Sequence, residues 1–158
     1  MNRLDKRAHR DFPGFDVDGM LGRLAKWLRI LGFDAVFPRA APSEGRVFVT
    51  TKKGAPSPCV IRILGGTITE QLREVLDHVG IVPHPDLIFS RCLLCNAAVE
   101  KVTRESVEGK VPGRVFGVTC AFHQCPQCGR VYWEGTHEAR VRKSLERMGI
   151  FTRTNSQL

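Results

Sequence analysis

The hydrophobic residues in the first half of the chain follow two alternating patterns. Short apolar runs predict β-strands at residues 15–17, 33–37, 46–50 and 60–64. From Met20 to Leu31, apolar residues recur at the spacing of an amphipathic helix that Gly32 would end. A second amphipathic stretch follows Thr67-Ile-Thr-Glu70, a helix-capping box, and ends at Gly80. Because strands alternate with helices, the sequence predicts an α/β fold with a mostly parallel sheet.

The second half of the chain shows shorter patterns. We expect a last apolar strand at 87–89 and extended segments at 114–118 and 131–133. A final helix is expected to begin with Thr136 as its N-cap and to carry a short apolar seam as far as Met148.

These patterns divide the chain into four expected segments. They are a flexible basic arm at 1–13, an α/β domain at 14–90, a metal-binding module with a C-terminal helix at 91–150, and a polar tail at 151–158. The arm is assigned because its residues are mostly charged, include few apolar groups and end at a proline.

Two CxxC pairs, Cys92-Leu-Leu-Cys95 and Cys125-Pro-Gln-Cys128, form the most specific motif in the chain. Within each pair a tight turn brings two sulfurs toward one ion, and two such pairs complete a tetrahedral site. Four thiolates leave no open coordination position, so the pattern predicts a structural Zn²⁺ ribbon. Two disulfides or free thiols are the alternatives. Cys120 and His123 lie nearby, but the paired spacing favours the four motif cysteines as ligands.

Composition narrows the set of partners. The chain has 158 residues and a net charge of +8, with 24 Lys and Arg against 16 Asp and Glu. This surplus favours a polyanionic partner, most simply nucleic acid. No apolar run approaches the ~20 residues of a membrane span. The N-terminus lacks the apolar core of a secretory signal, so we expect a cytoplasmic protein, where CxxC pairs more often bind metal than form disulfides.

Asp18 stands between the first predicted strand and the first predicted helix. Ligands of an open parallel sheet bind at this edge, and a carboxylate there can hold Mg²⁺. The alternative is an ordinary helix N-cap. Metal-assisted phosphodiester cleavage needs several converging carboxylates, and the sequence does not show that cluster clearly. It shows no glycine-rich phosphate loop and no Ser/His/Asp or Cys/His set, so no small-molecule cofactor is expected.

The stretch FDVDGMLGRLAKWLRILGFD at 15–34 resembles the opening of the PIN-like RNase domain named for the C-terminus of the Mut-seven exonuclease. RCLLCN at 91–96 and CPQCGRVYWEGTH at 125–137 resemble the second half of the same family. The resemblance covers about residues 14–149. It implies a three-layer α/β/α domain followed by a four-cysteine zinc ribbon, and a ribonuclease activity that depends on Mg²⁺ or Mn²⁺. It also makes Asp18 and Asp34, which match acids of the family, the catalytic candidates.

Two departures from the family pattern predict an incomplete nuclease centre. The family usually has an acidic helix-forming segment before its third strand, where this chain has only the short, proline-containing loop 39–45. The family usually has an aspartate after the third strand, where this chain has Lys53. A lysine ammonium near the metal position would repel the cation and occupy its place.

The function expected from these features is RNA binding by a family member with an incomplete nuclease centre. Phosphate contacts from basic side chains and stacking by an aromatic ring would supply the affinity. The residues expected to contact RNA are Arg23, Lys26, Trp27, Arg29, Lys52, Lys53 and His137. The alternatives are an active Mg²⁺- or Mn²⁺-dependent ribonuclease, a component or accessory factor of the ribosome or another ribonucleoprotein particle, and a protein-interaction module.

Overall fold

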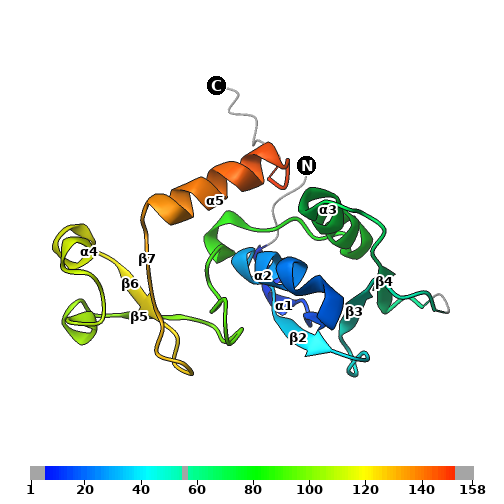
Figure 1. Cartoon of the computed structure of the whole chain (residues 1–158), viewed down its shortest axis with the longest axis horizontal. Helices are drawn as coiled ribbons and strands as arrows, with labels where there is room; N and C mark the ends of the chain where they lie inside the picture. The colour runs from blue at the N-terminus through cyan, green and yellow to red at the C-terminus, as the bar shows by residue number, and fades with distance from the viewer. Residues whose placement is uncertain (1–5, 55–56, 152–158) are drawn as a thin grey trace. The chain divides into compact units, whose positions relative to one another are not determined.

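The computed structural model describes residues 6–54 and 57–151, and the chain divides into two compact units between Asn96 and Ala97 (Figure 1). The division lies six residues further along the chain than the expected boundary at 90/91. The first unit is an α/β domain and the second is a small unit built on an antiparallel sheet. None of the helices in the described ranges has the length and hydrophobicity needed to cross a membrane.

The first unit is organised around four parallel strands. They are β1 (Phe15–Asp18), β2 (Ala35–Arg39), β3 (Val47–Thr50) and β4 (Val60–Arg62), in the spatial order β2-β1-β3-β4. Phe15 pairs with Ala35 on one side and with Val47 on the other. All four strands therefore end at one edge of the sheet, which we call the carboxyl edge. The predicted α/β fold with a parallel sheet is confirmed.

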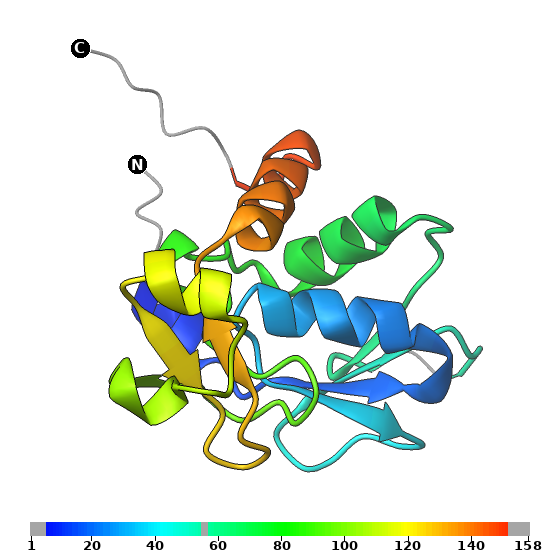
Figure 2. The same ribbon diagram turned by 60° about the vertical axis from the view of Figure 1, so that its left-hand side comes forward.

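Two helices cover one face of this sheet. Helix α2 (Gly22–Ile30), preceded by the 3-10 turn η1 (Gly19–Leu21), packs against β1, β2 and helix α3 (Ile68–Val79). Figures 1 and 2 both place α2 and α3 on the same side of the sheet. Apolar side chains of β1 and β3 and of both helices are buried there: Phe15, Val17, Leu24, Leu28, Val49, Leu72 and Val75. This burial, worth roughly 1.5–3 kcal/mol for each large side chain, fixes which face of each element points inward.

The capping box predicted at the start of the second helix is present in full. The Glu70 amide donates to Thr67 Oγ1 over 3.3 Å, and Glu70 Oε2 accepts from the Thr67 amide over 2.9 Å. Helix α3 ends at Gly80, whose φ of 66° is a conformation that glycine adopts without a steric penalty.

On the opposite face of the sheet, residues of the loop between β2 and β3 lie over Asp16. Asp16 points to this face, since its neighbours Phe15 and Val17 point toward the helices. Its Oδ2 accepts from the Ser43 amide over 2.6 Å, and its Oδ1 accepts from Arg46 Nε over 3.0 Å. This short loop, which contains Pro42, covers the buried carboxylate.

The N-terminal segment is ordered where the structure describes it, so the prediction of a flexible arm is wrong for residues 6–13. Residues Lys6–Asp11 form the short helix α1, and residues 1–5 lie outside the described residues. His9 is buried with its ring centroid 4.0 Å from that of Phe33, and the ring centroids of Phe12 and Phe15 lie 4.7 Å apart. Lys6 Nζ lies 2.7 Å from Asp86 Oδ2. The rings of His9 and Phe12 therefore hold this segment on the domain, although most of its residues are charged.

The strand expected at 87–89 is also wrong. Residues Pro85–Leu87 form the 3-10 turn η2, and Phe89 has a φ of 59°. The Phe89 amide donates to the Ile30 carbonyl at the end of α2 over 2.9 Å. Apolar residues at this point therefore fasten an irregular segment to the end of α2 and add no strand to the sheet.

The second unit contains a three-stranded antiparallel sheet in the order β5-β6-β7. The strands are β5 (Glu100–Val102), β6 (Phe122–Gln124) and β7 (Val131–Trp133), and the helices are η3 (Glu105–Val107), α4 (Gly113–Val118) and α5 (Thr136–Arg147). The expected strand at 131–133 is confirmed, whereas 114–118 is helical. The expectation that Thr136 is the N-cap of the final helix is wrong, since Thr136 is the first residue of α5. The N-cap of α5 is Gly135, which has no side chain that could accept a hydrogen bond.

Candidate metal centre and nucleic-acid surface

The four motif cysteines come together in one cluster. The sulfurs of Cys92, Cys95, Cys125 and Cys128 all lie within 4.8 Å of one another. Tetrahedral coordination with Zn–S bonds of ~2.3 Å would separate the sulfurs by ~3.8 Å, so four thiolates in this arrangement fit a zinc ion. No disulfide joins the cysteines of the described residues, and the four motif sulfurs are placed as the ligands of one ion. Cys120 and His123 are not part of the cluster.

Each CxxC pair forms a tight turn that aims backbone amides at sulfur. In the first knuckle, which we define as residues 91–96, the Cys95 amide donates to Cys92 Sγ over 3.4 Å. In the second knuckle, residues 125–130, the Cys128 amide donates to Cys125 Sγ over 3.5 Å. Asn96 and Gly129 follow the two pairs with φ values of 66° and 74°. A residue in the left-handed conformation after each pair lets the chain reverse its direction and run away from the sulfur cluster.

The first knuckle belongs to the α/β unit, which explains why the boundary lies beyond it. Arg29 Nη1 donates to the carbonyls of Leu93 and Leu94 over 2.9 and 3.1 Å. Asn96 Oδ1 accepts from the Ala35 amide over 3.0 Å, and Asn96 Nδ2 donates to Asp34 Oδ1 over 2.7 Å. Residues of α2 and of the start of β2 therefore hold the knuckle from two directions.

Asp18 lies at the carboxyl edge, at the end of β1, and is 3% exposed. Its Oδ2 accepts from Thr50 Oγ1 over 2.6 Å, and its Oδ1 accepts from the Met20 amide over 3.3 Å. The side chain thus caps η1, as its alternative interpretation predicts. Lys52 Nζ lies 3.4 Å from Asp18 Oδ2. The cation that meets this carboxylate is therefore Lys52, whereas the sequence pattern assigned that place to Lys53.

The Asp18 carboxyl is ionised in this environment. The hydrogen bond from Thr50 holds its pKa below the ordinary value, and the Met20 amide and Lys52 act in the same direction against the opposing effect of burial. The charge is balanced by an ammonium group of the same chain. Within the described residues, the four cysteines form the single group of three or more possible metal ligands. One carboxylate beside a lysine does not fit a divalent catalytic ion.

Asp34, the second catalytic candidate, does not lie beside Asp18 in the fold. It precedes β2 and lies at the amino edge of the sheet, where the strands begin. Arg46 Nη2 donates to Asp34 Oδ1 over 2.8 Å, and Arg46 Nε donates to Asp16 Oδ1 over 3.0 Å. Burial opposes ionisation of Asp34, but the hydrogen bonds from Arg46 and Asn96 outweigh it and lower its pKa. A single centre that contains both Asp18 and Asp34 is therefore incompatible with this fold.

The predicted RNA-contacting residues fall into different environments. Arg23, Lys26, Lys52 and Lys53 are exposed, and Trp27 is half-buried. Arg29 is 7% exposed and its guanidinium donates to three backbone carbonyls, of Ala35, Leu93 and Leu94. The prediction that Arg29 contacts RNA is therefore wrong, because its guanidinium is buried and bonded to backbone carbonyls of the same chain.

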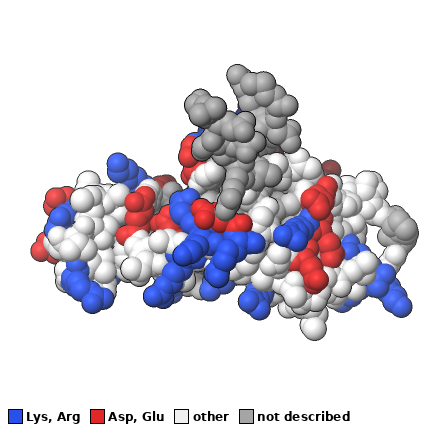
Figure 3. Space-filling model, turned by 90° about the horizontal axis from the view of Figure 1, so that it is seen from above, with Lys and Arg blue, Asp and Glu red and all other residues white. Residues whose placement is uncertain are grey.

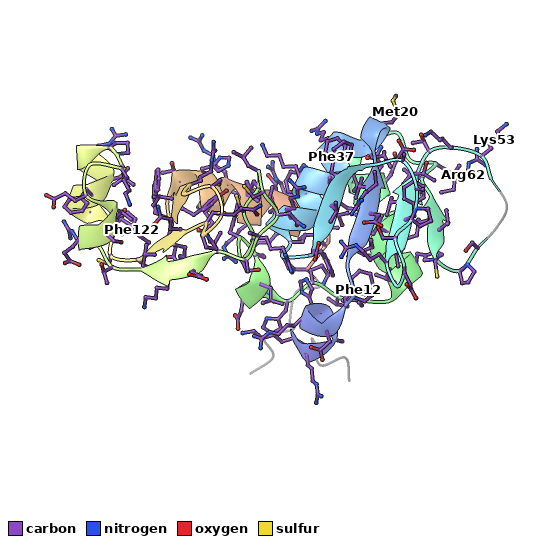
Figure 4. All side chains as sticks on the ribbon, turned by 90° about the horizontal axis from the view of Figure 1, so that it is seen from below. Phe12, Met20, Phe37, Lys53, Arg62 and Phe122 are labelled. Atoms are coloured by element: carbon purple, nitrogen blue, oxygen red, sulfur yellow. The ribbon has the colours of Figure 1, made fainter. Side chains whose placement is uncertain are left out.

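Sequence reasoning missed two basic residues at the carboxyl edge. Arg39 ends β2 and Arg62 ends β4, and both are exposed. In the view of Figure 4, Met20, Lys53 and Arg62 lie along one side of the α/β unit and Phe12 lies on the opposite side. The signal was available, because basic residues that end parallel strands meet at one edge of the sheet.

The second unit carries its own basic residues on α5. His137 and Lys143 are exposed, as are Arg140 and Arg147. Figure 3 looks onto α5 and shows Lys and Arg side chains gathered there with acidic side chains beside them. Arg142, also on this helix, is paired with Glu138 over 2.7 Å.

Comparison with protein-family models identifies a family for most of the chain. A protein-family model, the Mut7-C RNAse domain, matches residues 13–145. No curated protein matches, and no solved structure matches. The matched residues include the carboxyl edge with Asp18 and all four clustered cysteines. The chain belongs to the Mut7-C RNAse domain family.

Proposed function

We propose that this protein binds RNA through the carboxyl edge of its parallel sheet and lacks a working metal-dependent nuclease centre. The observation that carries the proposal is the pairing of Lys52 Nζ with Asp18 Oδ2 at 3.4 Å. An ammonium at that distance occupies the space in which a divalent ion would meet the carboxylate, and it repels the ion. Family membership supports an RNA-related role, and the ion pair argues against cleavage.

The electrostatics of the carboxyl edge favour a polyanion. The strand ends and the residues directly after them, 19–23, 38–43, 51–54 and 62–66, contain no Asp or Glu, although the Glu74 carboxylate of α3 accepts from the amides of Leu64 and Gly65 there. These four stretches contribute five cations, Arg23, Arg39, Lys52, Lys53 and Arg62. Two of these have internal acidic partners, since Lys52 pairs with Asp18 and Arg39 Nε lies 3.6 Å from Asp16 Oδ1. Arg23, Lys53 and Arg62 remain to contact phosphates.

Exposed apolar side chains lie beside these cations. Met20 is 78% exposed and Leu64 is 75% exposed, and each comes shortly after a strand end. Apolar side chains beside a row of cations are suited to unstacked bases whose phosphates follow the row. This combination supports single-stranded segments of RNA as the ligand.

The metal of the four-cysteine cluster is assigned as zinc in this proposal. Four thiolates within 4.8 Å of one another suit a tetrahedral ion, and a closed set of ligands gives the ion a structural role. The cluster therefore supports the fold and takes no part in chemistry on RNA.

The test uses one labelled RNA with both paired and unpaired segments. Binding is followed by fluorescence anisotropy, and cleavage is followed on a gel with Mn²⁺ or with EDTA. The wild type is expected to bind at low salt and to leave the RNA intact under both conditions. Mn²⁺-dependent cleavage that Asp18→Asn abolishes would instead establish an active ribonuclease in which Lys52, 65% exposed, moves aside. The absence of binding at low salt would reject the RNA-binding role itself.

A place in a ribonucleoprotein particle is a narrower form of the same proposal. The exposed basic residues of α5 give the second unit a cationic surface of its own, and a large RNA would engage both units at once. Co-sedimentation with ribosomal particles that persists through a salt wash is the expected result. Release of all the protein at moderate salt, with retained affinity for short RNA, would point to a free RNA-binding protein.

A further inference from the structure

The two halves of the metal site are built differently. The first knuckle lies in the compact unit that contains the parallel sheet, whereas the second knuckle lies in the smaller unit that begins at Ala97. The strands of the smaller unit are three residues long. A sheet of that size has little apolar surface to bury and depends on metal binding for its folding free energy.

Hydrogen bonds from the α/β unit fix the backbone of the first knuckle. Arg29, 7% exposed, holds the carbonyls of Leu93 and Leu94 between the two cysteines, and its Nε donates to the Ala35 carbonyl over 2.9 Å. Arg91 Nη1 donates to the Asn96 carbonyl over 2.8 Å. These bonds are made within one unit and do not involve the sulfurs, so they persist when the metal leaves.

The side chain of Asn96 connects the knuckle to the buried charge network of the sheet. It accepts from the Ala35 amide and donates to Asp34, whose carboxylate is in turn held by Arg46. Asp34 is thus a positioning residue for the knuckle. In the second knuckle the corresponding residue is Gly129, which has a similar φ and no side chain to form such a link.

We propose that Cys92 and Cys95 form a preorganised half of the zinc site, which stays folded without metal, whereas the half that contains Cys125 and Cys128 folds only when metal binds. In this scheme zinc enters at the first knuckle, which offers two converging thiolates from a fixed backbone. The second knuckle then closes over the ion, and residues 97–150 become ordered. Loss of metal reverses the order and leaves the α/β unit intact.

Hydrogen exchange of the full chain, with and without a strong chelator, tests this order. Peptides that cover 91–96 are expected to keep their protection after metal removal, while peptides that cover 120–133 exchange at least tenfold faster. Equal loss of protection in both regions would overturn the proposal, because the first knuckle would then also depend on metal. Unchanged protection in both regions would overturn it as well, since the second knuckle would not need the ion.

A pair of matched variants tests the role of Asn96. Asn96→Gly keeps the left-handed backbone and removes the link to Asp34, and it is expected to speed zinc release by about tenfold, as is usual for residues that support metal ligands. Gly129→Asn places an asparagine at the corresponding point of the second knuckle, where an added Cβ would meet only Gln124 Nε2 at 3.8 Å. Its zinc release is expected to change less than twofold. Equal effects of the two substitutions would overturn the assignment of Asn96 and Asp34 as positioning residues.

Discussion

Lys52 Nζ lies 3.4 Å from Asp18 Oδ2, and Thr50 Oγ1 donates to the same oxygen over 2.6 Å. Two donors from β3 and the segment after it therefore meet the buried acid that ends β1. Asp18 is one of the two residues that the family resemblance marks for catalysis, yet here its charge is balanced within the chain. These two donors help to keep the carboxylate ionised at 3% exposure.

The hydroxyl of Thr50 should contribute measurably to stability. Thr50→Val removes a partner of a buried carboxylate, and we expect it to lower the free energy of unfolding in urea by about 1–2 kcal/mol at neutral pH. Thr50→Ser keeps the hydroxyl and should lose less. If valine and serine have the same effect, the hydrogen bond to Asp18 contributes nothing.

Arg46 and Arg39 offer a matched comparison, because both lie near Asp16 Oδ1. Arg46 is 18% exposed and bonds to Asp16 at 3.0 Å, whereas Arg39 is 45% exposed and lies at 3.6 Å. Arg46→Met leaves Asp16 and Asp34 without their shared cation and should cost about 3 kcal/mol in urea unfolding. Arg39→Met should cost less than about 1 kcal/mol, as for other exposed ion pairs. Similar costs would contradict the role of Arg46 as the shared partner of Asp16 and Asp34.

His9 should make stability depend on pH in the mildly acid range. Burial, with His84 and Arg91 nearby, lowers the pKa of His9 from 6.5 to about 4. Between pH 6.5 and about 4, His9 therefore binds a proton in the unfolded chain but stays neutral in the folded chain. The contribution of neutral His9 to the free energy of unfolding is fully present above pH 6.5 and is lost as the pH falls toward 4. The total loss is at most about 3 kcal/mol.

His9→Gln isolates this effect from protonation of the cysteines. Urea unfolding of wild type and variant is compared at several pH values between 7 and 4, with the same zinc concentration. The wild type should lose more stability than the variant as the pH falls. Parallel pH profiles would show that His9 titrates normally in the folded protein.

Metal content should follow the two CxxC motifs alone. Wild-type protein is expected to carry one zinc ion per chain by elemental analysis, and Cys125→Ser should weaken retention strongly because a thiolate ligand is lost. Cys120→Ser should retain the full content, since Cys120 lies outside the cluster. Equal retention by both variants would reject the four-thiolate assignment.

The parts of the fold that follow from local rules were predictable from sequence. The Thr67–Glu70 capping box and the two CxxC turns each depend on a few neighbouring residues, and each forms as expected. Parallel strands followed from the alternation of apolar runs with amphipathic stretches. These features need no knowledge of distant partners.

The features that sequence reasoning missed depend on distant contacts. Arg29 looks like a surface residue of α2 until Leu93 and Leu94, more than sixty positions later, bring their carbonyls to it. Helix α1 is anchored by His9 on Phe33 and by Lys6 on Asp86. The lysine that faces Asp18 is Lys52, whereas the family pattern aligns its aspartate with Lys53. The backbone turn after β3 determines which of the two side chains points to Asp18, and the sequence motif does not reveal that turn.

The measurement that tests the central claim most directly is RNA affinity as a function of salt for two charge-matched double variants. Lys53→Ala with Arg62→Ala removes two cations from the carboxyl edge. Lys101→Ala with Lys110→Ala removes two exposed cations from the second unit. With labelled single-stranded RNA, we expect the first variant to bind several-fold more weakly and the magnitude of its salt slope to fall by about 1.4, which corresponds to two lost phosphate contacts. The second variant should stay close to wild type, and equal losses in the two variants would contradict binding at the carboxyl edge.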